Sequence, residues 1–444
     1  MITQPHTEPC PSEKHKMVHS KIMAKLLTLL LVCGPGLIVM VADNDAGAVS
    51  TYTQAGAQYG TKLLWLLLCL LPVTYFIQEM VARLGIATGQ GHAAMIYKRF
   101  GKWWGIFSLF DLQLVNFLTL VTEFAAINLA AAEMGISPYL AVPLAAVGLI
   151  LVVTCCKYRR WERIMIFLCA IDLAWIPLAI RSHITGHALI HAALLPSLPI
   201  GGITSSFVFL VIAIVGTTIA PWQLFFQQSC VADKRLRFSD LPWERLETFI
   251  GAVVIVAMAG CMMLVGTLFC QQVLLHGGNA IVAIQNFTPA VMAHYLGQYF
   301  GPWMKDLVLL LMVNASLLGA ATISLASAWA YGEVKGWPSS LEMNLKDAFG
   351  FYAIYAAAVS LAAGLVLIPR APLNLIILGV QVLAGVMLPS TIVFLQLLLN
   401  DKELLGIQFA NKPWNNWVNW TIIIILFLLS MILAMQVMLP NLIK

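Results

Sequence analysis

Residues 41–48 read VADNDAGA and place two carboxylates, Asp43 and Asp45, inside a long apolar run. The run begins LLTLLLVCGPGLIVM at 26–40 and resumes as LLWLLLCLLPV at 63–73. A charged side chain at the centre of a bilayer costs roughly 2.5 to 3.5 kcal/mol even on insertion scales. We therefore expect these carboxylates to bind something that offsets their charge.

The composition of the whole chain defines its class. The 444 residues are 60% hydrophobic and 10% charged, and their mean hydropathy is +0.87. Such values are typical of a polytopic membrane protein and exclude a water-soluble globule. The formal net charge of +5 does not indicate nucleic-acid binding, because the Lys and Arg residues lie in the loops between apolar runs. The short loops leave no room for a separate soluble domain.

Hydropathy predicts an all-α protein with eleven transmembrane helices. The predicted spans are 28–58, 62–82, 104–132, 138–157, 162–181, 205–230, 248–274, 302–330, 350–369, 373–399 and 416–440. Residues 1–27 form a polar tail without the features of a signal peptide. With that tail in the cytosol, only five of the 25 Lys and Arg residues fall on the outer side. The positive-inside rule therefore predicts a cytosolic N-terminus and an outer C-terminus in the plasma (inner) membrane.

Two of the predicted helices are interrupted. Residues Asp45-Ala46-Gly47 lie within the first span, and Pro221 lies within the sixth, where it removes an amide donor and clashes with the preceding turn. The interruptions are five helices apart, which predicts two five-helix repeats of inverted topology whose broken helices meet near the midplane. The repeats would cover 28–182 and 205–399, separated by an extracellular loop at 183–204 and followed by 400–444 with the eleventh helix.

An interrupted helix frees backbone carbonyls, which are tolerated inside a membrane only where they are buried in protein or line a polar cavity. Carbonyls beside a carboxylate suit a hard cation. Transporters of amino acids also use broken helices, but there the helix N-termini hold a substrate carboxylate, which Asp45 would repel. The pattern therefore favours a cation as the substrate.

Four segments resemble the Nramp family of divalent metal transporters. GPG at 34–36 with DAG at 45–47 and QAGAQYG at 54–60 is similar to the first helix of that family, and QEMVARLGIATGQG at 78–91 to the second. GTTIAPWQLFFQ at 216–227 is similar to the sixth helix, and QVLAGVMLP at 381–389 to the tenth. The resemblance covers about residues 30–400 and implies the fold of the amino-acid and cation symporters.

The resemblance also implies a metal site. Asp45 matches the metal-binding Asp of the family, Ala42 and Thr217 match residues that supply carbonyl oxygens, and Gln381 matches a residue that supplies a side-chain amide. Asn44 and Gln223 follow the same breaks and are further candidate amide ligands. No catalytic residue and no bound cofactor are expected.

Three positions depart from the family pattern. Ala48 replaces the hallmark Asn, Ala220 replaces a metal-binding Met, and Trp222 replaces a His. The lost thioether removes a preference for soft ions. Magnesium accepts oxygen ligands and retains water, so it suits a roomier site. The pattern resembles the Nramp-related magnesium transporters.

A second His of the family is Gln227 here, and the third helix carries Glu123 without the acidic residue expected three positions later. We therefore predict a magnesium transporter, with manganese as a second candidate cargo. It is expected to work by alternating access as a monomer in the lipid bilayer, without proton coupling. The alternatives are a proton-coupled manganese or iron importer and a non-transporting metal sensor on the same fold.

Further polar residues within the predicted spans carry expectations of their own. Glu123 is expected to be a structural hydrogen-bond partner, with a residual proton carrier as the alternative. Glu79 and Arg83 are expected to form an i,i+4 pair. Asp43 is expected either to widen a negative vestibule or to face solvent at the break. Asp172 has no assigned partner.

Overall fold

The computed structural model describes residues 34–438 apart from 198–201, 203, 286 and 370–371. Within these residues ten helical segments are long and apolar enough to cross a membrane. The half-helices α2 (Pro35–Ala42) and α3 (Ala46–Tyr59) are each too short, and together they supply the eleventh span. The predicted all-α fold with eleven spans is therefore confirmed. The predicted tail at 1–27 lies outside the described residues.

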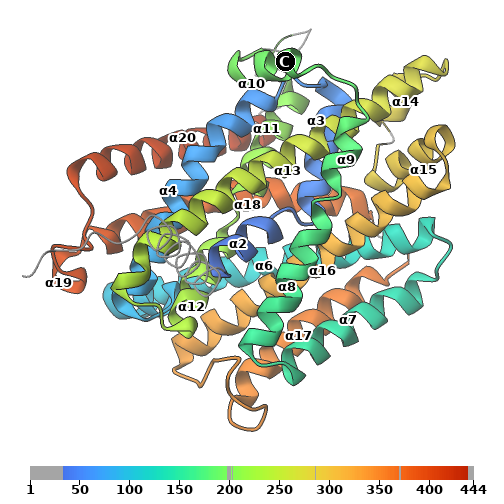
Figure 1. The fold of residues 1–444 in the computed structure, drawn as a ribbon. Helices are drawn as coiled ribbons and strands as arrows, with labels where there is room; N and C mark the ends of the chain where they lie inside the picture. The colour runs from blue at the N-terminus through green and yellow to red at the C-terminus, as the bar shows by residue number, and fades with distance from the viewer. Residues whose placement is uncertain (1–33, 198–201, 203, 286, 370–371, 439–444) are drawn as a thin grey trace, which may run out of the picture.

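The remaining helices follow the predicted order (Figure 1). The first repeat continues with α4 (Leu64–Thr88), α5 (His92–Phe100), α6 (Lys102–Glu133), α7 (Pro138–Cys155), α8 (Tyr158–Asp172) and α9 (Trp175–Ile180). The second contains α11 (Ser205–Thr218), α12 (Pro221–Lys234), α13 (Leu241–Leu275), α14 (Ala280–Gln285), α15 (Pro289–Phe300), α16 (Pro302–Lys335), α17 (Phe349–Val366) and α18 (Leu373–Leu399). After it come α19 (Lys402–Leu405) and α20 (Pro413–Met438). Residues 186–194 of the predicted outer loop form a helix, α10 (Gly186–Leu194).

Equivalent helices of the two repeats pack against each other. Helix α4 contacts α13, α6 contacts α16, and α7 contacts α17. These are the second, third and fourth helices of each repeat, each beside its own counterpart. This pairing is the one expected when a pseudo-two-fold axis runs between these helices. The broken helices α2/α3 and α11/α12 lie among these pairs (Figure 1).

Apolar side chains on the outside of the bundle face the lipid. On α7, Leu140, Leu144, Val147 and Leu151 are all exposed. Their spacings of four, three and four residues put them on one face of the helix. An exposed apolar stripe of this kind on a membrane-spanning helix is typical of a lipid-facing surface. The polar residues that remain buried between the helices need a separate explanation.

Both predicted breaks are present. Helix α2 ends at Ala42 and α3 begins at Ala46, leaving Asp43, Asn44 and Asp45 between them. Helix α11 ends at Thr218 and α12 begins at Pro221. Proline is favoured at the first position of a helix, because its missing N–H would have no intrahelical partner there.

Candidate metal-binding site at the two helix breaks

Asp45 forms the N-cap of α3. Its backbone is extended, and its Oδ1 accepts a hydrogen bond of 2.9 Å from the Ala48 N–H. An Asp at this position satisfies one of the unpaired N–H groups at a helix start, which is the local reason why α3 begins here. The side chain is buried, so its charge lies at the positive end of α3 and inside the protein.

Glu123 of α6 is the neighbour of Asp45. Its Oε2 accepts a hydrogen bond of 3.1 Å from the Ala46 N–H, and its carboxyl group lies within hydrogen-bonding reach of the Asp45 carboxyl group. Gly319 of α16 makes room for this pair, since a Cβ there would lie 2.9 Å from the Asp45 Cβ and 3.0 Å from the Glu123 Cδ. Glu123 is therefore a hydrogen-bond partner of the first break, and its contact with Asp45 was not predicted.

The hydrogen bond that the Ala46 N–H donates to Glu123 also explains why the Ala42 C=O has no donor from its own helix. In a continuous helix the Ala42 C=O would accept from the N–H of residue 46, which here donates to Glu123 instead. In the second break the Thr217 C=O would accept from residue 221, which is a proline without an N–H. Both carbonyls assigned by resemblance thus lack their helical donor for an identifiable reason.

Gln381 of α18 joins the two breaks. Its Oε1 accepts a hydrogen bond of 2.9 Å from the Thr217 Oγ1. A Cβ at Gly47 would lie only 1.6 Å from the Gln381 Nε2, so this glycine allows the amide to reach the first turn of α3. Gln381 and Thr217 therefore meet beside the start of α3, as their assignment to one site requires.

Asp43 and Asn44 are buried within the break. Their exposed fractions are 1% and 0%, so the expectation that Asp43 faces solvent is wrong, because the surrounding helices close over the break. Neither side chain has a hydrogen-bond partner among the described residues. Gln223 of α12 lies beside Asp43, and its Oε1 accepts a hydrogen bond of 2.9 Å from the Gln78 Nε2. Asp43 therefore lies buried in the first break beside Gln223, although the ligand assignment from sequence omitted it.

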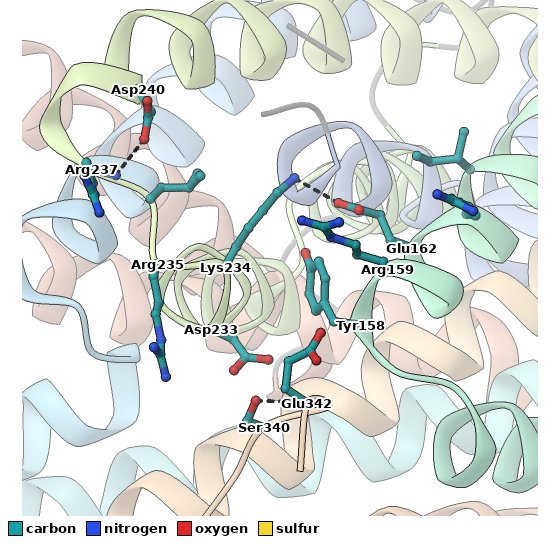
Figure 2. Close-up of a pocket in the computed structure, with 13 residues that line it drawn as sticks. Tyr158, Arg159, Glu162, Asp233, Lys234, Arg235, Arg237, Asp240, Ser340 and Glu342 are labelled. Carbon is teal, nitrogen blue, oxygen red and sulfur yellow. Dashed lines mark hydrogen bonds and ion pairs between the residues drawn. The ribbon is translucent and has the colours of Figure 1, made fainter. Parts of the chain in front are cut away.

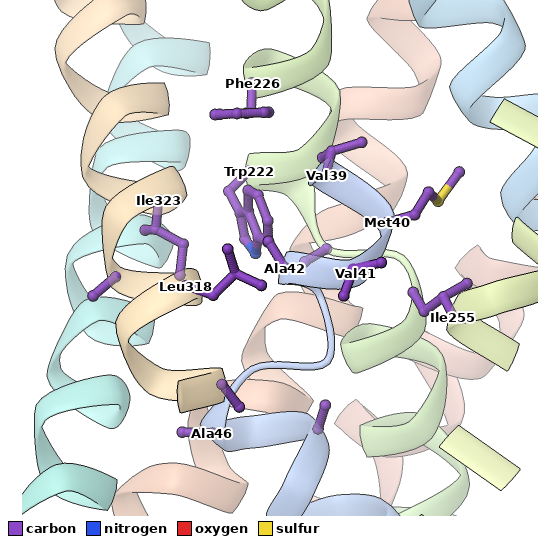
Figure 3. Close-up of a cluster of buried hydrophobic side chains, with 14 of the residues drawn as sticks. Val39, Met40, Val41, Ala42, Ala46, Trp222, Phe226, Ile255, Leu318 and Ile323 are labelled. Carbon is purple, nitrogen blue, oxygen red and sulfur yellow. The ribbon is translucent and has the colours of Figure 1, made fainter. Parts of the chain in front are cut away.

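Small residues and one large ring surround these polar groups. Ala48 and Ala220 are buried at the breaks and contribute no donor beyond their backbones. The Trp222 ring lies beside Val39 and Ala42 of α2 and faces Leu318 and Ile323 of α16 (Figure 3). Trp222 is fully buried, so it packs the two half-helices against α16 on one side of the break.

The donors near the breaks are carboxylate, amide, hydroxyl and carbonyl oxygens. Across the described part of the chain, no three His, Cys, Asp or Glu side chains converge to hold a metal ion. A cation at the breaks would therefore rely on neutral oxygens and water beside Asp45 and Asp43. Oxygen ligands of this kind suit Mg²⁺, Ca²⁺ and Mn²⁺.

Two other intramembrane polar pairs are now defined. Glu79 and Arg83 form the predicted i,i+4 ion pair at 3.2 Å, and Arg245 adds a second bond to Glu79 at 2.7 Å. Asp172 accepts a hydrogen bond of 2.7 Å from the Asn314 Nδ2 of α16. The partner of Asp172 comes from a distant helix, so no local pattern in the sequence pointed to it.

Two inverted repeats with a polar site at paired helix breaks define a membrane transporter of the symporter-like fold. The chain belongs to the Nramp family: the family model for natural resistance-associated macrophage protein-like proteins matches residues 36–436. The family consists of membrane transporters, and the expected class is confirmed.

Relatives and solved structures agree with this assignment. The chain is 25% identical to the divalent metal cation transporter MntH of Pediococcus pentosaceus, with 92% of each chain covered. It is 26% identical to MntH of Staphylococcus saprophyticus, with 94% of each covered. A structure of the Eremococcus coleocola manganese transporter superposes with a TM-score of 0.72 at 20% identity, covering 93% of this chain and 88% of that one. MhsT in complex with L-phenylalanine has a TM-score of 0.56 at 14% identity, with coverages of 90% and 97%.

Proposed function

We propose that this chain carries a hard divalent cation across the membrane by alternating access, binding it through oxygen atoms at the two helix breaks. The observation that carries the proposal is the set of buried oxygens without partners in the first break, on Asp43 and Asn44. Buried polar groups are normally hydrogen-bonded, and buried charges are normally paired or coordinated to a metal. A dication held by Asp43, Asp45 and the freed carbonyls would satisfy both conditions.

Two cargoes compete for this site. The oxygen donors and the small residues Ala48 and Ala220 favour Mg²⁺, which keeps several of its waters. Sequence and structural similarity favour Mn²⁺, because the curated relatives are divalent metal cation transporters and the superposed structure is a manganese transporter. The comparisons therefore agree better with the manganese alternative than with the magnesium branch, and none of them names magnesium.

The coupling ion is a separate question. Trp222 and Gln227 cannot carry protons as histidines do, which supports uncoupled transport. The contact between Glu123 and Asp45 supports the opposite mechanism, because two adjacent buried carboxylates repel each other unless a proton or a metal lies between them. Coupling is not needed for uptake, since an inward potential of 100 mV favours entry of a dication by about 4.6 kcal/mol.

Liposomes containing the purified chain test cargo and coupling together. Mg²⁺ entry, Mn²⁺ entry and internal pH are followed with separate dyes under an imposed potential. We expect both metals to enter, with no acidification of the interior. Entry of Mn²⁺ alone with matching acidification would establish the proton-coupled alternative, and no entry of either metal would refute the transport proposal.

A further inference from the structure

A second group of buried oxygens lies at the other end of α2, away from the break. Glu247 of α13 accepts hydrogen bonds on its Oε1 from the Gly34 N–H at 2.6 Å and from the Leu37 N–H at 2.8 Å. The first N–H groups of a helix have no partner within that helix. Glu247 therefore caps α2 from a neighbouring helix and ties the start of α2 to α13.

Glu244 lies one turn before Glu247 on α13. Residues three apart on a helix are neighbours, and the two carboxyl groups lie within hydrogen-bonding reach of each other. The Gln227 Nε2 of α12 donates to the Glu244 Oε1 at 3.2 Å and to the Thr248 Oγ1 at 3.4 Å. We call Gln227, Glu244 and Glu247 the α13 cluster.

Each side chain of the α13 cluster keeps one oxygen without a partner. The exposed fractions of Gln227, Glu244 and Glu247 are 0%, 0% and 1%. The Glu244 Oε2, the Glu247 Oε2 and the Gln227 Oε1 have no hydrogen-bond partner among the described residues. A single proton shared between Glu244 and Glu247 would give each carboxyl group a hydrogen-bond partner. It would still leave the Gln227 Oε1 without a partner.

A charged neighbour of the α13 cluster lies on α12. Lys234 at the end of α12 is the nearby cation, and its Nζ lies 2.9 Å from the Glu162 Oε1 (Figure 2). Glu162, Glu244 and Glu247 thus lie near Lys234. A hollow of about 820 Å³ opens beside the pair formed by Lys234 and Glu162. The hollow beside the ion pair is also lined by Arg159, Arg163, Arg235 and Arg237.

We propose that the α13 cluster is a second divalent-cation site, distinct from the site at the helix breaks. Two carboxylate oxygens and one amide oxygen are hard ligands, and water would complete the coordination of a Mg²⁺ or Mn²⁺ ion. The bound ion would connect α13 to α12 through Gln227 and to α2 through Glu247. It would therefore tie the start of α2 and the middle of α12, two of the half-helices that alternating access must move, to α13.

Counting bound Mn²⁺ on the purified full chain by equilibrium dialysis with radioactive metal tests this proposal. We expect two Mn²⁺ per wild-type chain, and one after Glu244→Gln with Glu247→Gln. Asp45→Asn, which alters only the site at the breaks, should also leave one, and the triple variant should leave none. Asp111→Asn is the matched control, because that buried carboxylate already has a partner in Ser390 at 2.7 Å.

One Mn²⁺ on the wild type that disappears in Asp45→Asn would overturn the second site while leaving the site at the breaks intact. Two Mn²⁺ on a folded double variant would overturn it as well. If the double variant fails to elute as a single species, Gln227→Ala replaces it, since both carboxylates then remain. We expect this variant to bind the second Mn²⁺ about tenfold more weakly, and unchanged binding would overturn the proposal.

Discussion

Replacing Asp45 by Asn keeps the cap of α3 but removes the negative charge proposed to bind the metal ion. The Asp45 Oδ1 caps α3 through the Ala48 N–H at 2.9 Å, and Asn caps helices about as well as Asp. We therefore expect the unfolding temperature of Asp45→Asn in detergent to stay close to that of the wild type. Asp45→Ala loses the cap, and we expect its free energy of unfolding to fall by about 1 kcal/mol.

The effect on metal binding should be much larger. Asp45 is buried, and removing one partner of a buried charge pair costs roughly 2 to 5 kcal/mol of binding energy. A loss of this size corresponds to an increase in the Kd for Mn²⁺ of about 30-fold to about 5,000-fold. Transport into liposomes at micromolar Mn²⁺ should fall to the level of empty vesicles.

Calorimetric titration of Mn²⁺ at the breaks and uptake into liposomes measure this effect, with Asp111→Asn as the control for a buried carboxylate outside the site. A folded Asp45→Asn variant whose Kd stays within threefold of the wild type would show that Asp45 does not hold the ion. Equal losses in Asp45→Asn and Asp111→Asn would show that any buried charge change disturbs binding indirectly.

Three further substitutions test the surroundings of Asp45. Asp43→Asn should weaken Mn²⁺ binding by at least tenfold, because both of its buried oxygens lack partners, and unchanged titration would remove Asp43 from the site. Gly319→Ala should lower the free energy of unfolding by about 1 to 3 kcal/mol through overpacking against Asp45 and Glu123, whereas Gly364→Ala, which has open space, should not. Ala48→Asn with Ala220→Met should reduce Mg²⁺ uptake and shift binding toward Cd²⁺, because a thioether favours softer ions; an unchanged metal preference would contradict the role given to these alanines.

Much of the fold could be predicted because membrane helices are specified by local composition. Eleven apolar runs predicted the eleven spans. Asp45 and Pro221 predicted where the two helix breaks lie, and the structure confirms both predictions. The pair formed by Glu79 and Arg83 was predictable for the same reason, since a spacing of four residues puts two side chains on one helix face. These features depend on neighbours in the chain, so they are visible before the helices pack.

Only the tertiary structure decided which polar groups meet. Glu123 reaches Asp45 across 77 residues of sequence to bind the Ala46 N–H, and Thr217 reaches Gln381 across 164. For Asp43, exposure to solvent was one of two expectations, but the side chain is buried because other helices cover the break. Hydropathy and helical periodicity specify each helix and its breaks; contacts between distant helices depend on packing geometry, which no local pattern encodes.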